Sequence, residues 1–134
     1  MTITKQTTKD EIMAMDDLYR HDLTECHERL TDDEDVVLKF IETSFTEFRY
    51  ASDRLKSDRE FVKRAVQIDP PCFLYADQSL RKDKKFIIEL IELSNANIID
   101  CVYFTVRESM NEHLKQPAIE YLKNELEKEA KKND

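Results

Sequence analysis

The 134 residues include no Gly, no Trp and three Pro; 40% are hydrophobic and 37% are charged. A single domain is expected at this length. Phosphate-binding loops, dinucleotide fingerprints and the nucleophile elbow of hydrolases all need Gly where the backbone turns tightly or approaches a ligand, so the composition excludes them. Tight hairpins also favour Gly. An all-α chain is therefore predicted.

The charge is concentrated near the N-terminus. The formal net charge is −8, and residues 9–35, with eleven acidic and three basic side chains, carry the whole excess. Such an acidic field repels phosphate backbones and anionic lipids. We therefore expect no nucleic acid and no membrane among the partners, and favour another protein with a basic surface.

The start of the chain lacks the apolar segment of a secretory signal, and no apolar run reaches the ~18 positions that a membrane-spanning helix needs. Cys26, Cys72 and Cys101 are odd in number and far apart, which favours free buried thiols in a reducing compartment. We expect a cytoplasmic protein, with translocation into a host cell by a specialised secretion system as an alternative.

The first predicted element is an N-terminal helix over residues 8–22, preceded by a disordered segment at residues 1–7. Thr8 and Glu11 have the spacing of a capping box, which predicts where the helix begins. An apolar stripe runs on from Ile12 to Leu30. It is compatible with one helix of about 22 residues or with two helices and a bend near residue 20.

A repeat with a period of about 25 residues follows. Its units are predicted at residues 23–47, 48–72 and 73–97. Equivalent positions hold large apolar residues, then small residues, then Leu, then Asp, then apolar pairs. The first four of these sets are Leu23, Phe48 and Phe73; Cys26, Ala51 and Ala76; Leu30, Leu55 and Leu80; and Asp33, Asp58 and Asp83.

Each unit reads as a pair of helices. In the second unit, Phe48, Ala51 and Leu55 fall on one helical face. The segment 57–60 has the spacing of a capping box that starts the second helix, and prolines at 70 and 71 end the unit.

Residues 98–134 are predicted as a degenerate fourth unit followed by a C-terminal capping helix that starts near Pro117. The narrow apolar stripe of this last helix could also seat a second copy of the chain, which leaves a homodimer open. The predicted fold is thus a single all-α domain, a short array of stacked helix pairs with about seven or eight helices.

The segments at residues 48–66 and 73–91 resemble the domain-of-unknown-function family 4116. The shared pattern is an aromatic residue or Leu, then Ala, Leu, a basic residue, Asp and an apolar pair, over roughly residues 23–91. The family's usual Asn-Gly turn is replaced here, for example by residues 69–71. The resemblance implies tandem short helices and a binding array, as found in bacterial proteins delivered into host cells, and implies no catalytic residue.

Candidate chemical sites have simpler explanations. The three recurrent Asp residues are expected to cap helices rather than to form a carboxylate cluster. His21, Cys26 and His27 lack zinc-ligand spacing. Cys72 or Cys101 with His113 lacks any local signature of a nucleophile and its base. The equivalent Tyr50 and Tyr75 are read as packing rather than as a stacking site for a ligand. We therefore expect no catalytic residue, metal or cofactor.

The acidic surface is the main candidate site. If residues 9–30 form one helix, its outer face presents an apolar residue ringed by acids, as in a charge-steered interface. The residues of this candidate partner-binding face are Asp10, Asp17, Leu18, His21, Glu25 and Glu28. The simpler interpretation is a solvated face with Leu18 covered by a neighbouring helix.

These observations favour a non-enzymatic interaction module that binds, and regulates or inhibits, another protein. The alternatives are a small hydrolase or transferase that uses Cys, His or carboxylates, and an architectural homodimer formed through residues 117–132.

Overall fold

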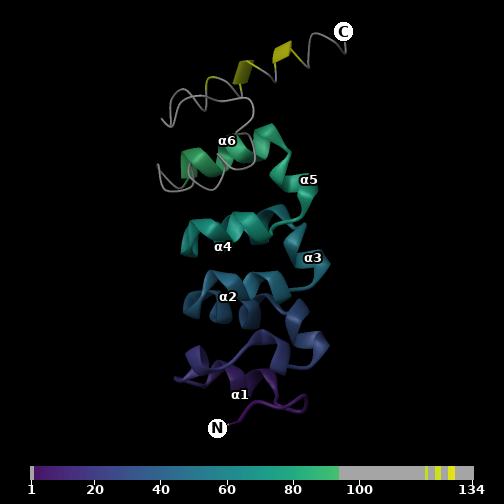
Figure 1. The fold of residues 1–134 in the computed structure, drawn as a ribbon, viewed down its shortest axis with the longest axis vertical. Coiled ribbons are helices and arrows are strands. Elements are labelled where there is room, and N and C mark those ends of the chain that lie inside the picture. The colour runs from purple at the N-terminus through teal and green to yellow at the C-terminus, as the bar shows by residue number, and fades with distance from the viewer. Residues whose placement is uncertain (1, 94–119, 121–122, 125–126, 129–134) are drawn as a thin grey trace.

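The computed structural model describes residues 2–93, 120, 123–124 and 127–128. The all-α prediction is confirmed, since the described residues form helices and contain no strand. Helices α2, α4 and α6 lie in successive layers along the long axis, with the short helices α3 and α5 at one side (Figure 1). This is the stacked array expected from the repeat.

Residues 2–93 contain six α-helices and five short 3-10 helices, labelled η. Their bounds are α1 Lys9–Met13, η1 Leu18–Arg20, η2 Leu23–Glu25, η3 Glu28–Asp32, α2 Glu34–Thr43, η4 Phe45–Tyr50, α3 Asp53–Lys56, α4 Arg59–Ile68, η5 Pro70–Tyr75, α5 Gln78–Arg81 and α6 Lys84–Leu93. Each repeat unit thus has a first half made of a 3-10 helix and a short turn of helix, followed by a longer α-helix.

The repeat extends further toward the N-terminus than the sequence pattern indicated. Helices α1, α2, α4 and α6 begin at residues 9, 34, 59 and 84, which are evenly spaced. Lys9 at the start of α1 forms an ion pair with Asp33 at 3.1 Å, and Arg59 at the start of α4 pairs with Asp83 at 2.6 Å. Helix α1 therefore occupies the place of a long helix in a preceding, shortened unit.

The predicted Asp caps are confirmed. One carboxylate oxygen of each Asp accepts a hydrogen bond from the backbone N–H three residues later: Asp33 from Val36 at 3.1 Å, Asp58 from Phe61 at 3.1 Å, and Asp83 from Phe86 at 3.2 Å. These bonds satisfy amides that a helix start leaves open. The recurrence of Asp at the same place in each unit is thus explained by helix capping.

The predicted capping box at residues 57–60 is only half right. Asp58 is the cap, so the third helical position is Phe61, and Glu60 stands one residue too early to reach back to the cap. Glu60 instead forms an ion pair with Lys63 at 3.3 Å. The box at Thr8 and Glu11 is confirmed, with both of its hydrogen bonds present.

The helix expected in the first half of each unit is broken, which corrects the simple helix-pair prediction. The small residues Ala51 and Ala76 have extended backbones, with φ and ψ of −68° and 160°, and −66° and 158°. The N–H group of the following residue then donates to a carbonyl of the preceding unit instead of one in its own helix: Ser52 N–H donates to the Thr31 carbonyl at 2.9 Å, and Asp77 N–H donates to the Lys56 carbonyl at 2.8 Å. Small side chains suit this position because the chain passes close to the preceding unit.

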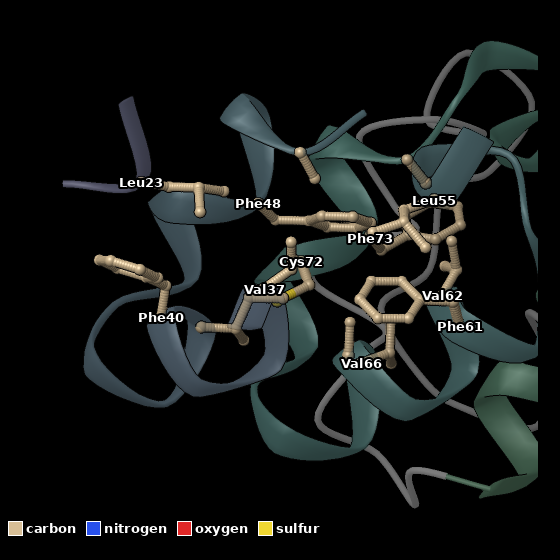
Figure 2. Packing of buried hydrophobic residues seen from close by; sticks show 14 of the residues in the cluster. Leu23, Val37, Phe40, Phe48, Leu55, Phe61, Val62, Val66, Cys72 and Phe73 are labelled. Atoms are coloured by element: carbon tan, nitrogen blue, oxygen red, sulfur yellow. The ribbon is translucent and has the colours of Figure 1, made fainter. Parts of the chain in front are cut away.

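The core runs through all units as one continuous apolar cluster. Leu23, Phe48 and Phe73, equivalent residues of the three units, are each 0% exposed, and Figure 2 shows them in a row above the side chains of the long helices. Leu30, Leu55 and Leu80 are also buried. Since each unit shares its apolar face with its neighbours, stacking provides the core that a single unit is too short to form.

The N-terminal predictions need correction. Residues 2–7 pack onto the array rather than being disordered, since Ile3 is buried and the Lys5 ammonium donates to the carbonyls of Thr24 and Cys26. The predicted helix over residues 8–22 is replaced by α1 and η1. Helix α1 stops early because the α2 side chain of Lys39 binds its last carbonyls, and a new turn then buries Leu18.

The predicted fourth unit, the final capping helix and the dimer segment at residues 117–132 lie almost wholly outside the described residues. The same holds for Cys101 and His113. Among the residues that are described, every helix is too short or too polar to cross a bilayer.

Candidate partner-binding surface

The six candidate residues do not share one helical face. Asp10 lies on α1, Asp17 precedes η1, Glu25 ends η2 and Glu28 begins η3. Leu18 is only 2% exposed, so its assignment as the exposed apolar centre of the face is wrong. The break after α1 turns Leu18 into the core.

Two of the candidates bind each other instead of facing a partner. His21 Nδ1 lies 3.1 Å from Glu25 Oε2, and Glu25 Oε1 accepts the N–H of Asp22 at 3.0 Å. These contacts lower the pKa of the Glu25 carboxyl, chiefly through the Asp22 backbone N–H. Glu25 therefore holds η2 in place, and its replacement would disturb the fold as well as the surface.

The remaining acidic residues are less engaged. Asp10, Asp16 and Glu28 are exposed, and Asp17 is partly exposed. Within the described part of the chain, none of these four carboxylates has a cation within ion-pair distance. By contrast, each basic residue of α4 has an acidic partner on a neighbouring element: one at the cap of α6, one within α6 and one in α2. Unpaired negative charge thus accumulates at the N-terminal end of the array.

Two hollows flank the C-terminal end of α1. The first, of about 360 Å³, is lined by Met13 of α1 and by Asp35, Leu38, Lys39 and Glu42 of α2. The second, of about 420 Å³, is lined by Glu11, Ala14, Met15, Asp16 and Asp17. Met13 is 40% exposed, which makes it an apolar side chain open to solvent beside acidic residues. The pattern expected around Leu18 is therefore found around Met13.

Lys39 fixes the wall between these hollows. Its ammonium group donates to the carbonyls of Ile12 at 3.1 Å, Met13 at 2.5 Å and Met15 at 2.8 Å. A cation is favourable at this end of a helix because its last carbonyls lack partners and carry partial negative charge. Spacing in the sequence does not reveal this contact, because it joins residues that are far apart along the chain.

Lys9 supports the other end of α1. It pairs with Asp33 at 3.1 Å and with Asp35 at 2.9 Å, and the bond to Lys9 lowers the pKa of the exposed Asp35 carboxyl. The short α1 is thus tied to α2 at both ends. The backbone that bounds the hollows beside α1 is therefore held in place by side-chain contacts from Lys9 and Lys39.

The zinc and nucleophile alternatives gain no geometric support. His27 Nδ1 accepts the N–H of Arg29 at 3.1 Å, while His21 binds Glu25, so the two rings have separate partners. No group of three potential ligands that could hold a metal occurs in the described part of the chain. Cys26 is buried and burial raises its thiol pKa to about 11, which disfavours the nucleophilic thiolate.

Tyr50 and Tyr75 pack against the core, as expected. Tyr75 stacks on Phe45 of the preceding unit with ring centroids 6.0 Å apart. Arg49 lies over the Tyr50 ring at 4.6 Å. These contacts account for the recurrent tyrosines without a bound ligand.

Glu47 is a buried acid that the sequence pattern did not reveal. It is 6% exposed, and its Oε2 accepts the N–H of Leu23 from the preceding unit at 2.7 Å. Burial raises the pKa of the Glu47 carboxyl, and the nearby Asp22 carboxylate raises it further. A signal was present, because the equivalent position in the next unit holds Cys72, a residue expected in the core.

Glu47 should make stability depend on pH in an unusual direction. Folding raises the pKa of Glu47 from an ordinary value of 4.5, so the protonated carboxyl is favoured in the folded state. Its stabilisation of the fold is therefore complete below pH 4.5 and is lost as the pH rises through the folded pKa. We expect Glu47→Gln to gain stability relative to wild type as pH increases above about 4.5. Urea unfolding from pH 4 to 7 checks this, with the exposed Glu28→Gln as the control for losing one charge. A Glu47→Gln difference that stays constant with pH would contradict the expectation.

Comparison with known proteins identifies one family. The model of the family described as "Domain of unknown function (DUF4116)" matches residues 33–79 and again residues 58–107, which together span more than half of the chain. The two matches begin at Asp33 and Asp58, the equivalent caps of α2 and α4, so the family pattern shifts by one structural unit. No curated protein and no solved structure matches the chain.

Proposed function

The chain belongs to the domain-of-unknown-function family 4116, and we propose that it is a non-enzymatic module that binds another protein through its acidic N-terminal surface. The observation that carries the proposal is the separation of charge along the array. Asp10, Asp16, Asp17 and Glu28 have no cation within ion-pair distance among the described residues, whereas the basic residues of α4 are paired with acids of neighbouring helices.

The physical chemistry of such a surface favours a basic protein. Unpaired surface carboxylates accelerate the encounter with a positively charged partner and reject anionic ones. The stacked units also suit this role, since solenoids offer extended surfaces without a central pocket. By covering a basic surface that the partner uses elsewhere, the module would regulate or inhibit that partner. The buried thiols of Cys26 and Cys72 support action in a reducing, cytoplasmic compartment.

Affinity capture with the full chain tests the proposal. We expect a basic protein to be recovered from the native host. Its binding should weaken as salt rises from about 0.05 to about 0.5 M, because the Debye length then falls from roughly 14 to roughly 4 Å. Reversal of charge at Asp10, Asp17 and Glu28 to Lys should abolish the capture. Glu25 is left unchanged because it holds η2.

A matched reversal at Asp53, Glu120 and Glu127, which are exposed and have no cation within ion-pair distance among the described residues, controls for total charge. Capture that is lost equally with this control triple would mean that net charge, not the N-terminal surface, is responsible. Capture that survives reversal at Asp10, Asp17 and Glu28 would overturn the proposed surface.

A further inference from the structure

We propose that the two hollows beside α1 form a docking site for a cationic amphipathic segment, with an apolar side chain of the partner in the Met13 hollow and a Lys or Arg in the hollow at Asp16 and Asp17. The inference rests on the proposed function and specifies the chemistry of the partner at one place. It concerns Met13 to Asp17 on one side and Leu38 and Glu42 of α2 on the other.

The apolar half of the site lies between two helices. Met13 projects from the end of α1 with 40% of its surface exposed, and Leu38 of α2 is only partly buried on the core. A thioether side chain is flexible and polarizable, so it adapts to an aliphatic or aromatic partner side chain. A hollow of about 360 Å³ beside these two residues is large enough for one such side chain.

The charged half differs in its lining. The hollow of about 420 Å³ is bounded by three carboxylate residues and by Ala14 and Met15, and no Lys, Arg or His is among its lining residues in the described part of the chain. Glu11 is held by its capping hydrogen bonds to Thr8, at 3.2 Å for the backbone N–H and 3.0 Å for the hydroxyl. The side chains of Asp16 and Asp17 have no such contacts among the described residues. Charge complementarity therefore selects a cation as the occupant.

The site is also held in position before binding. Lys39 binds three carbonyls at the end of α1, and Lys9 ties its start to Asp33 and Asp35. Neither ammonium group is a free cation that would draw a partner carboxylate. Because the wall is fixed, little ordering of the protein is needed on binding, which favours affinity.

The test uses a defined probe, a synthetic helical peptide of Leu and Lys, and the full chain labelled with ¹³C at its methionine methyl groups. We expect the Met13 and Met15 resonances to shift on titration. The double change Asp16→Asn and Asp17→Asn should weaken binding by about tenfold, and Met13→Gln by about fivefold. The matched pair Asp53→Asn and Glu60→Gln should stay within about twofold of wild type.

Each other outcome overturns something definite. If the peptide binds but the two methyl resonances do not shift, or if the matched pair weakens binding as much, the docking site is wrong while the proposed function stands. If neither the peptide nor any basic protein binds the wild-type chain, the proposed function itself fails. A Met13 shift that depends on the chain's own concentration, without peptide, would mean that a second copy fills the hollow and would overturn the cationic occupant.

Discussion

Replacement of Phe73 by Ala should lower the free energy of unfolding by about 3 to 5 kcal/mol, as truncation of a buried aromatic ring does. The ring is 0% exposed and continues the row formed by Leu23 and Phe48 (Figure 2). The cavity left behind cannot close easily, because the hydrogen bonds between units hold the flanking backbone in place. Urea denaturation followed by circular dichroism measures the effect.

The neighbouring Leu74 provides the matched control. It lies on the same 3-10 helix, η5, but is 38% exposed. We expect Leu74→Ala to change the free energy of unfolding by no more than about 0.5 kcal/mol, as surface substitutions usually do. Equal losses in the two variants would contradict the assignment of Phe73 to a core shared between units.

Replacement of Lys39 by Met should lower the free energy of unfolding by about 2 kcal/mol, the usual magnitude for hydrogen bonds to a charged group. The change removes the ammonium donor from the carbonyls of Met13 and Met15, and leaves the Ile12 carbonyl with only backbone donors, while keeping most of the apolar stem. Because these bonds end α1, we expect the loss to be concentrated there and to increase amide hydrogen exchange in residues 9–15. Thermal unfolding combined with hydrogen exchange measures both effects.

Lys82→Met serves as the control for this change, since Lys82 is exposed at the end of α5. It should leave the exchange of α1 unchanged. If Lys39→Met left the exchange of α1 at the wild-type rate, Lys39 could not be the residue that fixes the wall of the two hollows.

Much of the fold could be predicted because its determinants are local and recur. The chain has no Gly, an Asp stands at the start of each of the helices α2, α4 and α6, and an apolar pair recurs once in every unit. These features can be recognised from short stretches of sequence and from their repetition. The extended backbone at Ala51 and Ala76 could not be predicted in the same way. There a hydrogen bond to the preceding unit replaces one within the helix, and helical periodicity contains no signal for that exchange.

The candidate surface was predicted less well for a related reason. A net charge can be counted from the sequence, so the acidic character of residues 9–35 was evident. Which apolar side chain lies among the acids depends on where α1 ends, and that is set by Lys39 from α2. Leu18, which was expected to be exposed, is consequently buried, and Met13, for which no position was predicted, is exposed instead. The residues next to Glu47 contain no signal for its burial, because its partner, an amide of the preceding unit, is distant in the sequence; only the equivalent Cys72, one unit later, indicated a core position.

The stacking of units in register underlies both the fold and the surface, and amide hydrogen exchange tests it most directly. The N–H groups of Ser52 and Asp77, which donate to the preceding unit, should be protected as strongly as those in the middle of α4. Exchange of these two amides at the rate of an unfolded chain, with α4 still protected, would show that the units do not stack as described.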